Sequence, residues 1–149
     1  MSAMHPIIAV TGSSGAGTTS VMRTFEQIFR REQVRAAFIE GDSFHRYDRA
    51  TMKQKMAEAL AHGEYRFSHF GPDANLFEEL EALFRSYGEN GGGKRRRYLH
   101  DEQEAAPYGA KPGTFTEWEE LPEQTDLLFY EGLHGAVASS AIDVGRHVD

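Results

Sequence analysis

A glycine-rich stretch between an apolar run and a helical pattern limits most strongly what this chain can fold into. The apolar run covers residues 6–11, and the glycine-rich stretch follows it directly at 12–19. Glycine lets the backbone curl so that its N–H groups point inward, and a following helix adds the positive end of its dipole. This order of strand, turn and helix therefore predicts a cradle for nucleotide phosphates. The residues that we expect to form the cradle are Gly12, Ser13, Ser14, Gly15, Ala16, Gly17, Thr18, Thr19 and Ser20.

The stretch matches the phosphate-binding pattern G-x-x-x-x-G-K-[ST] at every fixed position except one, where Thr18 replaces the lysine. Thr19 holds the position whose hydroxyl usually ligates Mg2+. Two ordinary interpretations stay open at this point. The stretch could be a Gly/Ser-rich loop, and Thr19 could bond its own backbone at the start of a helix. The strand-to-helix context favours nucleotide binding.

The composition is typical of one globular domain. The chain has 149 residues, of which 40% are hydrophobic and 26% charged, so it is long enough to bury a core. The lack of cysteine excludes disulfides and zinc–thiolate sites, and the net charge of −7 argues against a protein that coats nucleic acid. No run is apolar enough to span a membrane, and the first residues lack the pattern of a secretory signal. We therefore expect a cytoplasmic protein whose partners include neither nucleic acid nor a membrane.

The spacing of apolar residues predicts the other elements. Helices are expected over about 18–32 and 52–62, and a third helix is expected to follow Asp73 as its cap. Strands are expected over 34–40, 94–98 and 127–131, with a polar loop before the last of them. Alternating strands and helices imply an α/β fold with a mostly parallel sheet and helices on both faces.

Acidic side chains stand at the ends of two of these strands. Asp42 comes just after the strand at 34–40, and Glu131 ends the strand at 127–131. The carboxyl ends of parallel strands meet at one edge of a sheet, next to the predicted cradle. We expect Asp42 to accept the proton of a substrate hydroxyl, and Glu131 to organise Mg2+ together with Thr19. Alone, an aspartate in a turn or a solvated charge at a strand end would be the ordinary interpretation.

Basic side chains close to Asp42 suit a sugar phosphate. His45, Arg46 and Arg49 follow it, and of these we retain His45 and Arg49 as predicted ligands. The basic run at 94–100 is by itself typical of a solvated surface. Alternation along a strand would nevertheless place one set of side chains toward an anionic substrate. The two sets are Arg95, Arg97 and Leu99 on one side, and Arg96, Tyr98 and His100 on the other.

Five segments, in chain order, resemble bacterial phosphoribulokinases: 12–20, 40–46, 67–72, 98–101 and 129–135. The resemblance covers essentially the whole chain, and the segments around Asp42 and Glu131 are its most specific parts. It implies a P-loop kinase fold and ATP- and Mg2+-dependent phosphorylation of D-ribulose 5-phosphate to ribulose 1,5-bisphosphate, a reaction of the Calvin cycle. It also implies roles for single residues. Asp42 is the catalytic base, Glu131 is the second catalytic acid, His45 and Arg49 bind the sugar phosphate, and Tyr98 and His100 lie near it.

The resemblance carries expectations beyond these residues. The bacterial branch tolerates a small hydroxyl residue at position 18, and similar enzymes respond to NADH and AMP and form homo-oligomers. Similar proteins continue for about as long again, so we expect residues 1–149 to be the N-terminal part of a single kinase domain, truncated at the C-terminus. In this fold the first strand lies between the third apolar strand and a fourth, which the chain lacks. The resemblance also implies that the missing half carries another acidic catalytic residue and several basic ones that close over the phosphates, so we expect this segment alone to be inactive.

Two alternatives stay open. The chain could be a uridine-kinase-like or pantothenate-kinase-like P-loop enzyme, although a nucleoside has no phosphate that would require the cations near Asp42. It could also be a non-catalytic nucleotide-binding module that regulates a partner. A bare edge on the first strand counts against such a complete, short protein.

Overall fold

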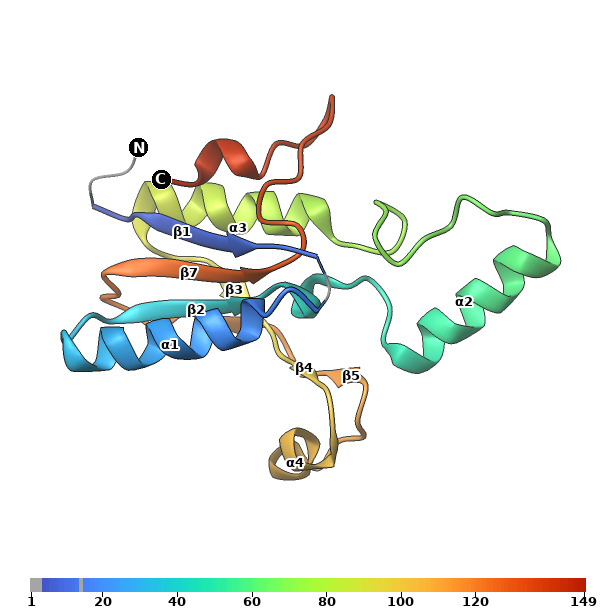
Figure 1. Cartoon of the computed structure of the whole chain (residues 1–149), viewed down its shortest axis with the longest axis horizontal. Helices are drawn as coiled ribbons and strands as arrows, with labels where there is room; N and C mark the ends of the chain where they lie inside the picture. The colour runs from blue at the N-terminus through green and yellow to red at the C-terminus, as the bar shows by residue number, and fades with distance from the viewer. Residues whose placement is uncertain (1–3, 14) are drawn as a thin grey trace.

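A sheet of three parallel strands forms the centre of the computed structural model, which describes residues 4–13 and 15–149 (Figure 1). The strands lie in the order β1 (Ile7–Thr11), β7 (Leu127–Gly132) and β2 (Ala36–Glu40). The sheet confirms the prediction that the third apolar strand runs beside the first. β2 begins two residues later than the predicted range 34–40, because Val34 donates its N–H to the Phe29 carbonyl of the preceding helix at 2.8 Å.

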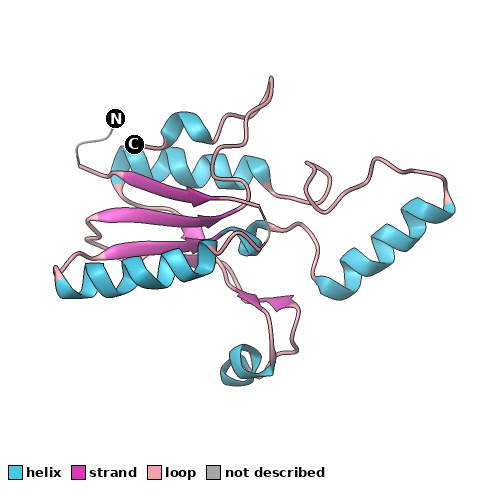
Figure 2. Ribbon diagram, viewed as in Figure 1, coloured by secondary structure: helices cyan, strands magenta, loops and turns pink. Residues whose placement is uncertain are grey.

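Helices cover both faces of this sheet, as the sequence predicts (Figure 2). On one face α1 (Thr18–Arg31) packs Met22 and Phe29 against Phe129 of β7. On the other face α3 (Phe77–Asn90) packs a row of side chains against the neighbouring residues of β7. That row is Leu80, Leu83, Phe84 and Tyr87. Helices thus pack on both faces of the sheet, which explains why the strands are mostly apolar before their carboxyl ends.

The second long helix, α2 (Arg49–Ala61), extends away from the sheet (Figure 1). It begins three residues before the predicted start at Met52, because the Asp48 side chain accepts a hydrogen bond from the Thr51 N–H at 2.8 Å. This N-cap places Arg49 inside the first turn of the helix.

The prediction that Asp73 caps the third helix is wrong. Leu76 precedes the first turn of α3, and no side chain caps it. Residues 74–76 are held by backbone bonds instead: Arg46 donates its N–H to the Ala74 carbonyl, and Leu76 donates to the Phe44 carbonyl. These bonds keep the chain extended beyond Asp73, so the helix starts later.

Residues 93–121 form an arm that runs out from the sheet and back (Figure 1). In place of the predicted strand 94–98 and polar loop, the arm contains two short antiparallel ladders. β3 (Lys94–Arg95) pairs with β6 (Glu119–Glu120), and β4 (Tyr98–Leu99) pairs with β5 (Thr114–Phe115). Its far end carries α4 (Glu102–Ala105) and a 3-10 turn (Ala106–Tyr108). The ladder is interrupted at Arg96 and Arg97, which the pattern of charges alone does not reveal.

Beyond β7 the chain returns along the outer side of β1. A short 3-10 turn (Gly145–His147) packs near α3, and the buried carboxylate of Glu81 accepts the Asp143 N–H at 3.0 Å. Asp149 donates its N–H to the carbonyl of Ile7, the first residue of β1, at 2.9 Å. Among the described residues no helix is both long and apolar enough to cross a membrane.

Candidate active site

The carboxyl ends of the three strands of the sheet surround a cavity of about 360 Å3, here called the cradle cavity. The glycine-rich loop after β1 forms one wall. Asp42, after β2, and Glu131, in β7, face the same space. The structure therefore brings together the three strand ends that the sequence singled out. The loop residues that line the cavity are Gly12, Ser13, Gly15, Thr18 and Thr19.

Two glycines of this loop have backbones that other residues rarely adopt. Gly15 has φ +83° and Gly17 has φ +85°, and Gly17 directly precedes the first turn of α1. Of the other residues predicted for the cradle, Ser14 lies outside the described residues. Ala16, Gly17 and Ser20 are described but do not line the cavity.

Glu131 is held by hydroxyl groups from the start of α1. Thr18 Oγ1 donates a short hydrogen bond to Glu131 Oε1, and Thr19 Oγ1 lies 3.5 Å from the same oxygen. Thr18, in the place of the usual lysine, thus supplies a hydrogen bond to a carboxylate instead of a positive charge. Hydroxyl and carboxylate oxygens are ligands that Mg2+ prefers, and it usually takes few protein ligands beside phosphate and water. Thr19 and Glu131 therefore fit a magnesium site.

Asp42 lies in a 3-10 turn (Gly41–Phe44) and contacts two histidines. Its Oδ2 lies 2.9 Å from His100 Nε2, and its Oδ1 lies 3.7 Å from His45 Nε2. The opposite ring nitrogen of His100, Nδ1, lies 3.0 Å from Glu104 Oε2. The hydrogen bond to Asp42 raises the pKa of His100 to about 9. The same bond lowers the pKa of Asp42, so the pair is ionised at neutral pH.

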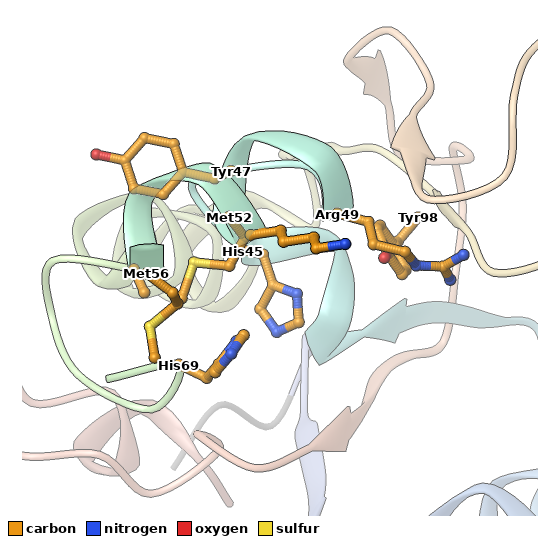
Figure 3. Close-up of a pocket in the computed structure, with 9 residues that line it drawn as sticks. His45, Tyr47, Arg49, Met52, Met56, His69 and Tyr98 are labelled. Atoms are coloured by element: carbon orange, nitrogen blue, oxygen red, sulfur yellow. The ribbon is translucent and has the colours of Figure 1, made fainter. Parts of the chain in front are cut away.

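A second cavity of about 420 Å3 adjoins the first and is here called the basic cavity (Figure 3). Both cavities are lined by His45 and His69, so the two spaces adjoin at these side chains. Arg49 and Tyr98 lie to one side of His45 in Figure 3, and Met52 and Met56 lie toward the other. The remaining lining residues are Tyr47, Lys53 and Ala74.

Three of the four predicted substrate ligands line the basic cavity: His45, Arg49 and Tyr98. The fourth, His100, contacts Asp42 and packs edge-on against Tyr98, with ring centroids 4.8 Å apart. Its carbonyl accepts a hydrogen bond from Arg49 Nη2 at 2.8 Å. Arg46 does not line the cavity and donates to the Asn75 carbonyl at 3.4 Å.

Sequence reasoning missed several residues of the site. Lys53 follows Arg49 by one helical turn. A predicted helix that began at Arg49 instead of Met52 would have placed both side chains on the same face. His69 and His134 come from loops far apart in the sequence, and only the fold brings them to the cradle cavity. Glu104 lies in α4, where the sequence predicts a polar loop.

Comparisons with known proteins show the family of this chain. A family model described as the phosphoribulokinase/uridine kinase family matches residues 7–149. The chromosomal phosphoribulokinase of Cupriavidus necator is 66% identical over 147 residues, which cover 99% of this chain and 50% of that protein. The phosphoribulokinase of Nitrobacter vulgaris is 63% identical over 145 residues, covering 97% of this chain and 50% of that protein.

A solved structure agrees with the sequence relatives. The phosphoribulokinase from Rhodobacter spheroides has a TM-score of 0.85 at 49% identity, over 98% of this chain and 49% of that one. The chain thus spans about half the length of the curated relatives it matches. The family model extends over almost the whole chain, and the solved structure shares its sheet and helices. The chain therefore has the P-loop kinase fold and belongs to the phosphoribulokinase/uridine kinase family.

Proposed function

We propose that this chain provides the nucleotide cradle and the acceptor pocket of an ATP-dependent kinase that converts D-ribulose 5-phosphate to D-ribulose 1,5-bisphosphate. One observation carries the proposal: a phosphate cradle and a basic cavity meet at His45 and His69. A kinase needs its two substrates side by side, because the attacking oxygen must approach the phosphoryl group in line. Two relatives that are 66% and 63% identical to this chain over almost its whole length carry the name phosphoribulokinase. Their names support the same reaction.

Asp42 is the proposed general base. In the reaction, the primary hydroxyl oxygen of the sugar forms a bond to the γ-phosphorus of ATP, the bond from that phosphorus to ADP breaks, and the hydroxyl proton passes to Asp42. The carboxylate is ionised and faces the cradle cavity, so it can accept that proton. Mg2+, held by Thr19 and Glu131, would neutralise charge on the nucleotide phosphates.

The basic cavity suits a sugar that already bears a phosphate. Arg49 and Lys53 extend from the first turns of α2, and His45 and His69 complete a set of basic side chains around the space. A phosphate dianion gains charge-assisted hydrogen bonds from Arg49 and Lys53, whereas burial lowers the pKa of His45, which therefore offers a neutral ring nitrogen. Uridine carries no charged group that these cations could bind, and the charge of pantothenate is a carboxylate rather than a phosphate dianion. The cavity therefore favours ribulose 5-phosphate over the acceptors of the related kinases.

We also propose that these residues are the N-terminal part of one kinase domain, inactive alone. The described residues that line the cradle cavity include two carboxylates but neither lysine nor arginine. Transfer of a phosphoryl group needs positive charge around it. The chain covers about half of its relatives' length, which leaves room for cations supplied elsewhere. A homo-oligomer, regulation by NADH and AMP, and a cytoplasmic location stay predictions.

Calorimetric titration of the chain with ribulose 5-phosphate, uridine and pantothenate tests the acceptor. We expect only the sugar phosphate to bind. Arg49→Gln should weaken that binding about tenfold, the usual effect of losing one charged hydrogen bond. Arg46→Gln, the matched control three residues before Arg49, should change it less than twofold. Tighter binding of uridine than of ribulose 5-phosphate would reverse the assignment.

Two further measurements test the proposal about the segment. Release of ADP that depends on ribulose 5-phosphate should be absent with the 149-residue chain and present with the protein purified from its natural source. The intact mass of that protein should lie well above 16.7 kDa. A matching mass would instead favour the regulatory module, which binds ATP without turnover.

A further inference from the structure

Arg96 of the arm, which the proposed mechanism does not use, reaches the turn that carries Asp42. Its Nε donates to the Ser43 carbonyl at 2.8 Å, and its Nη2 donates to the His45 carbonyl at 2.6 Å. Arg96 follows β3, where the ladder of the arm is interrupted. The guanidinium thus ties the arm to two carbonyls of one turn.

These two carbonyls belong to a segment that other contacts also hold: Ser43 Oγ donates to the Glu40 carbonyl at 2.6 Å, and the Phe44 side chain is buried in the core. Within it the His45 N–H bonds to the Asp42 carbonyl at 3.3 Å, and the Phe44 carbonyl accepts the Leu76 N–H at 2.7 Å. Ser43 is almost fully buried, so its carbonyl cannot easily exchange Arg96 for water. Without the guanidinium, the carbonyls of Ser43 and His45 would lose this partner, and the turn would lose its tie to the arm.

The surroundings of Arg96 select arginine rather than any cation. Its guanidinium carbon lies 3.6 Å from the ring centroid of Phe115 and 4.6 Å from that of Trp118. Trp118 also packs edge-on against Phe44, which lies in the same turn. The contacts of its guanidinium are aromatic faces and carbonyl oxygens, and the nearby carboxylate of Glu79 favours its charged form. A lysine cannot stack as a plane and donate to two carbonyls in fixed directions.

We propose that Arg96 is a positioning residue of this site: through the carbonyls of Ser43 and His45 it fixes the turn that directs Asp42 into the cradle cavity and His45 into both cavities. Phe115 and Trp118 hold its guanidinium plane at the required angle. The arm thereby contributes to acceptor binding without Arg96 touching the acceptor. This inference rests on the proposed function only for the identity of that acceptor.

The substitution Arg96→Lys in the 149-residue chain tests the proposal, because it keeps the positive charge and removes the planar guanidinium. Arg95→Lys is the matched control: Arg95 pairs with Glu119 at 3.3 Å and donates to the Phe38 carbonyl within β2, away from the turn. Amide NMR shifts of residues 42–45 in the free protein report the geometry of the turn. Calorimetry with ribulose 5-phosphate, and separately with ATP, reports the consequence for binding.

For Arg96→Lys we expect displaced amide signals at residues 42–45, ribulose 5-phosphate affinity at least tenfold weaker, and ATP affinity within twofold of the parent. Arg95→Lys should leave these signals and affinities unchanged. Unchanged signals at 42–45 in Arg96→Lys would overturn the positioning role. If the parent chain binds no ribulose 5-phosphate, the proposed function fails, whereas the amide signals still decide the role of Arg96. If Arg96→Lys does not fold, Trp118→Leu replaces it, and signals at 42–45 that stay unmoved in that variant overturn the proposal.

Discussion

The contact between Asp42 and His100 can be tested as a pH-dependent stabilising pair. His100 has a pKa of about 9, against an ordinary 6.5, and the hydrogen bond to Asp42 is the largest cause. Without any solvent screening, this rise in the pKa of His100 would correspond to about 3.4 kcal/mol of stabilisation of the protonated ring. The side chains of His100 and Asp42 are 38% and 55% exposed, so solvent screening reduces the contribution to the free energy of unfolding to about 1 kcal/mol.

The pH dependence of this contribution follows from the directions of the two pKa shifts. The folded state raises the pKa of His100. The contribution of His100 to the free energy of unfolding is therefore complete below about pH 6.5 and is lost as the pH rises through about 9. The folded state lowers the pKa of Asp42, so the contribution of Asp42 is present above about pH 3.8 and is lost as the pH falls further. The pair should therefore stabilise the chain most between about pH 4 and 6.5.

A double-mutant cycle measures the contact. Urea unfolding of the parent, Asp42→Asn, His100→Gln and the double variant should give a coupling of about 1 kcal/mol at pH 6 that disappears at pH 10. NMR titration of the His100 ring should show its pKa near 9 in the parent and lower in Asp42→Asn. Glu104→Gln should lower it less, because the Glu104 contact is the weaker cause. A coupling that is equal at pH 6 and pH 10 would refute an ionic contact between these residues.

Three further predictions concern packing and the metal. Gly41→Ala should destabilise the chain by about 1–3 kcal/mol in urea unfolding, because the new Cβ would lie 2.5 Å from the buried Tyr130 hydroxyl; an unchanged midpoint would contradict this. Phe129→Ala should lower the free energy of unfolding by about 3–5 kcal/mol, because the Phe129 side chain is 0% exposed among the aromatic rings under α1. The control Leu60→Ala, at a residue that is 58% exposed, should lower it by less than about 0.5 kcal/mol. Thr19→Val should weaken ATP binding in the presence of Mg2+ and have little effect with EDTA, as calorimetry with and without metal would reveal.

The sequence predicts the central sheet well because its strands are apolar and buried on both faces. The residues of β1, β2 and β7 follow local patterns, and the side chains after them necessarily meet at one edge. The convergence of Asp42 and Glu131 on the glycine-rich loop was predictable for this reason. Their chemical roles stay predictions.

The arm was not predictable, because its structure depends on contacts that are distant in sequence. The pairs Lys94–Glu120 and Tyr98–Phe115 join residues separated by a polar segment without an apolar repeat. Strand alternation nevertheless predicted that Arg96, Tyr98 and His100 share one side. In the structure Arg96 bonds to the turn that carries Asp42, Tyr98 lines the basic cavity and His100 contacts Asp42. The pattern indicated a shared side, but only the fold shows which neighbours it meets.

The charges of the two cavities explain why binding and turnover should separate in this chain. Cations gather at the basic cavity, where we expect Arg49 and Lys53 to hold a sugar phosphate. The cradle cavity instead holds Asp42 and Glu131, and Thr18 donates a hydrogen bond to Glu131 where a lysine would bring charge. Positive charge for the transferred phosphoryl group must then come with Mg2+ and from residues beyond these. A chain with this distribution should hold its acceptor well and its nucleotide only with metal, and should transfer phosphate only when those further cations are present.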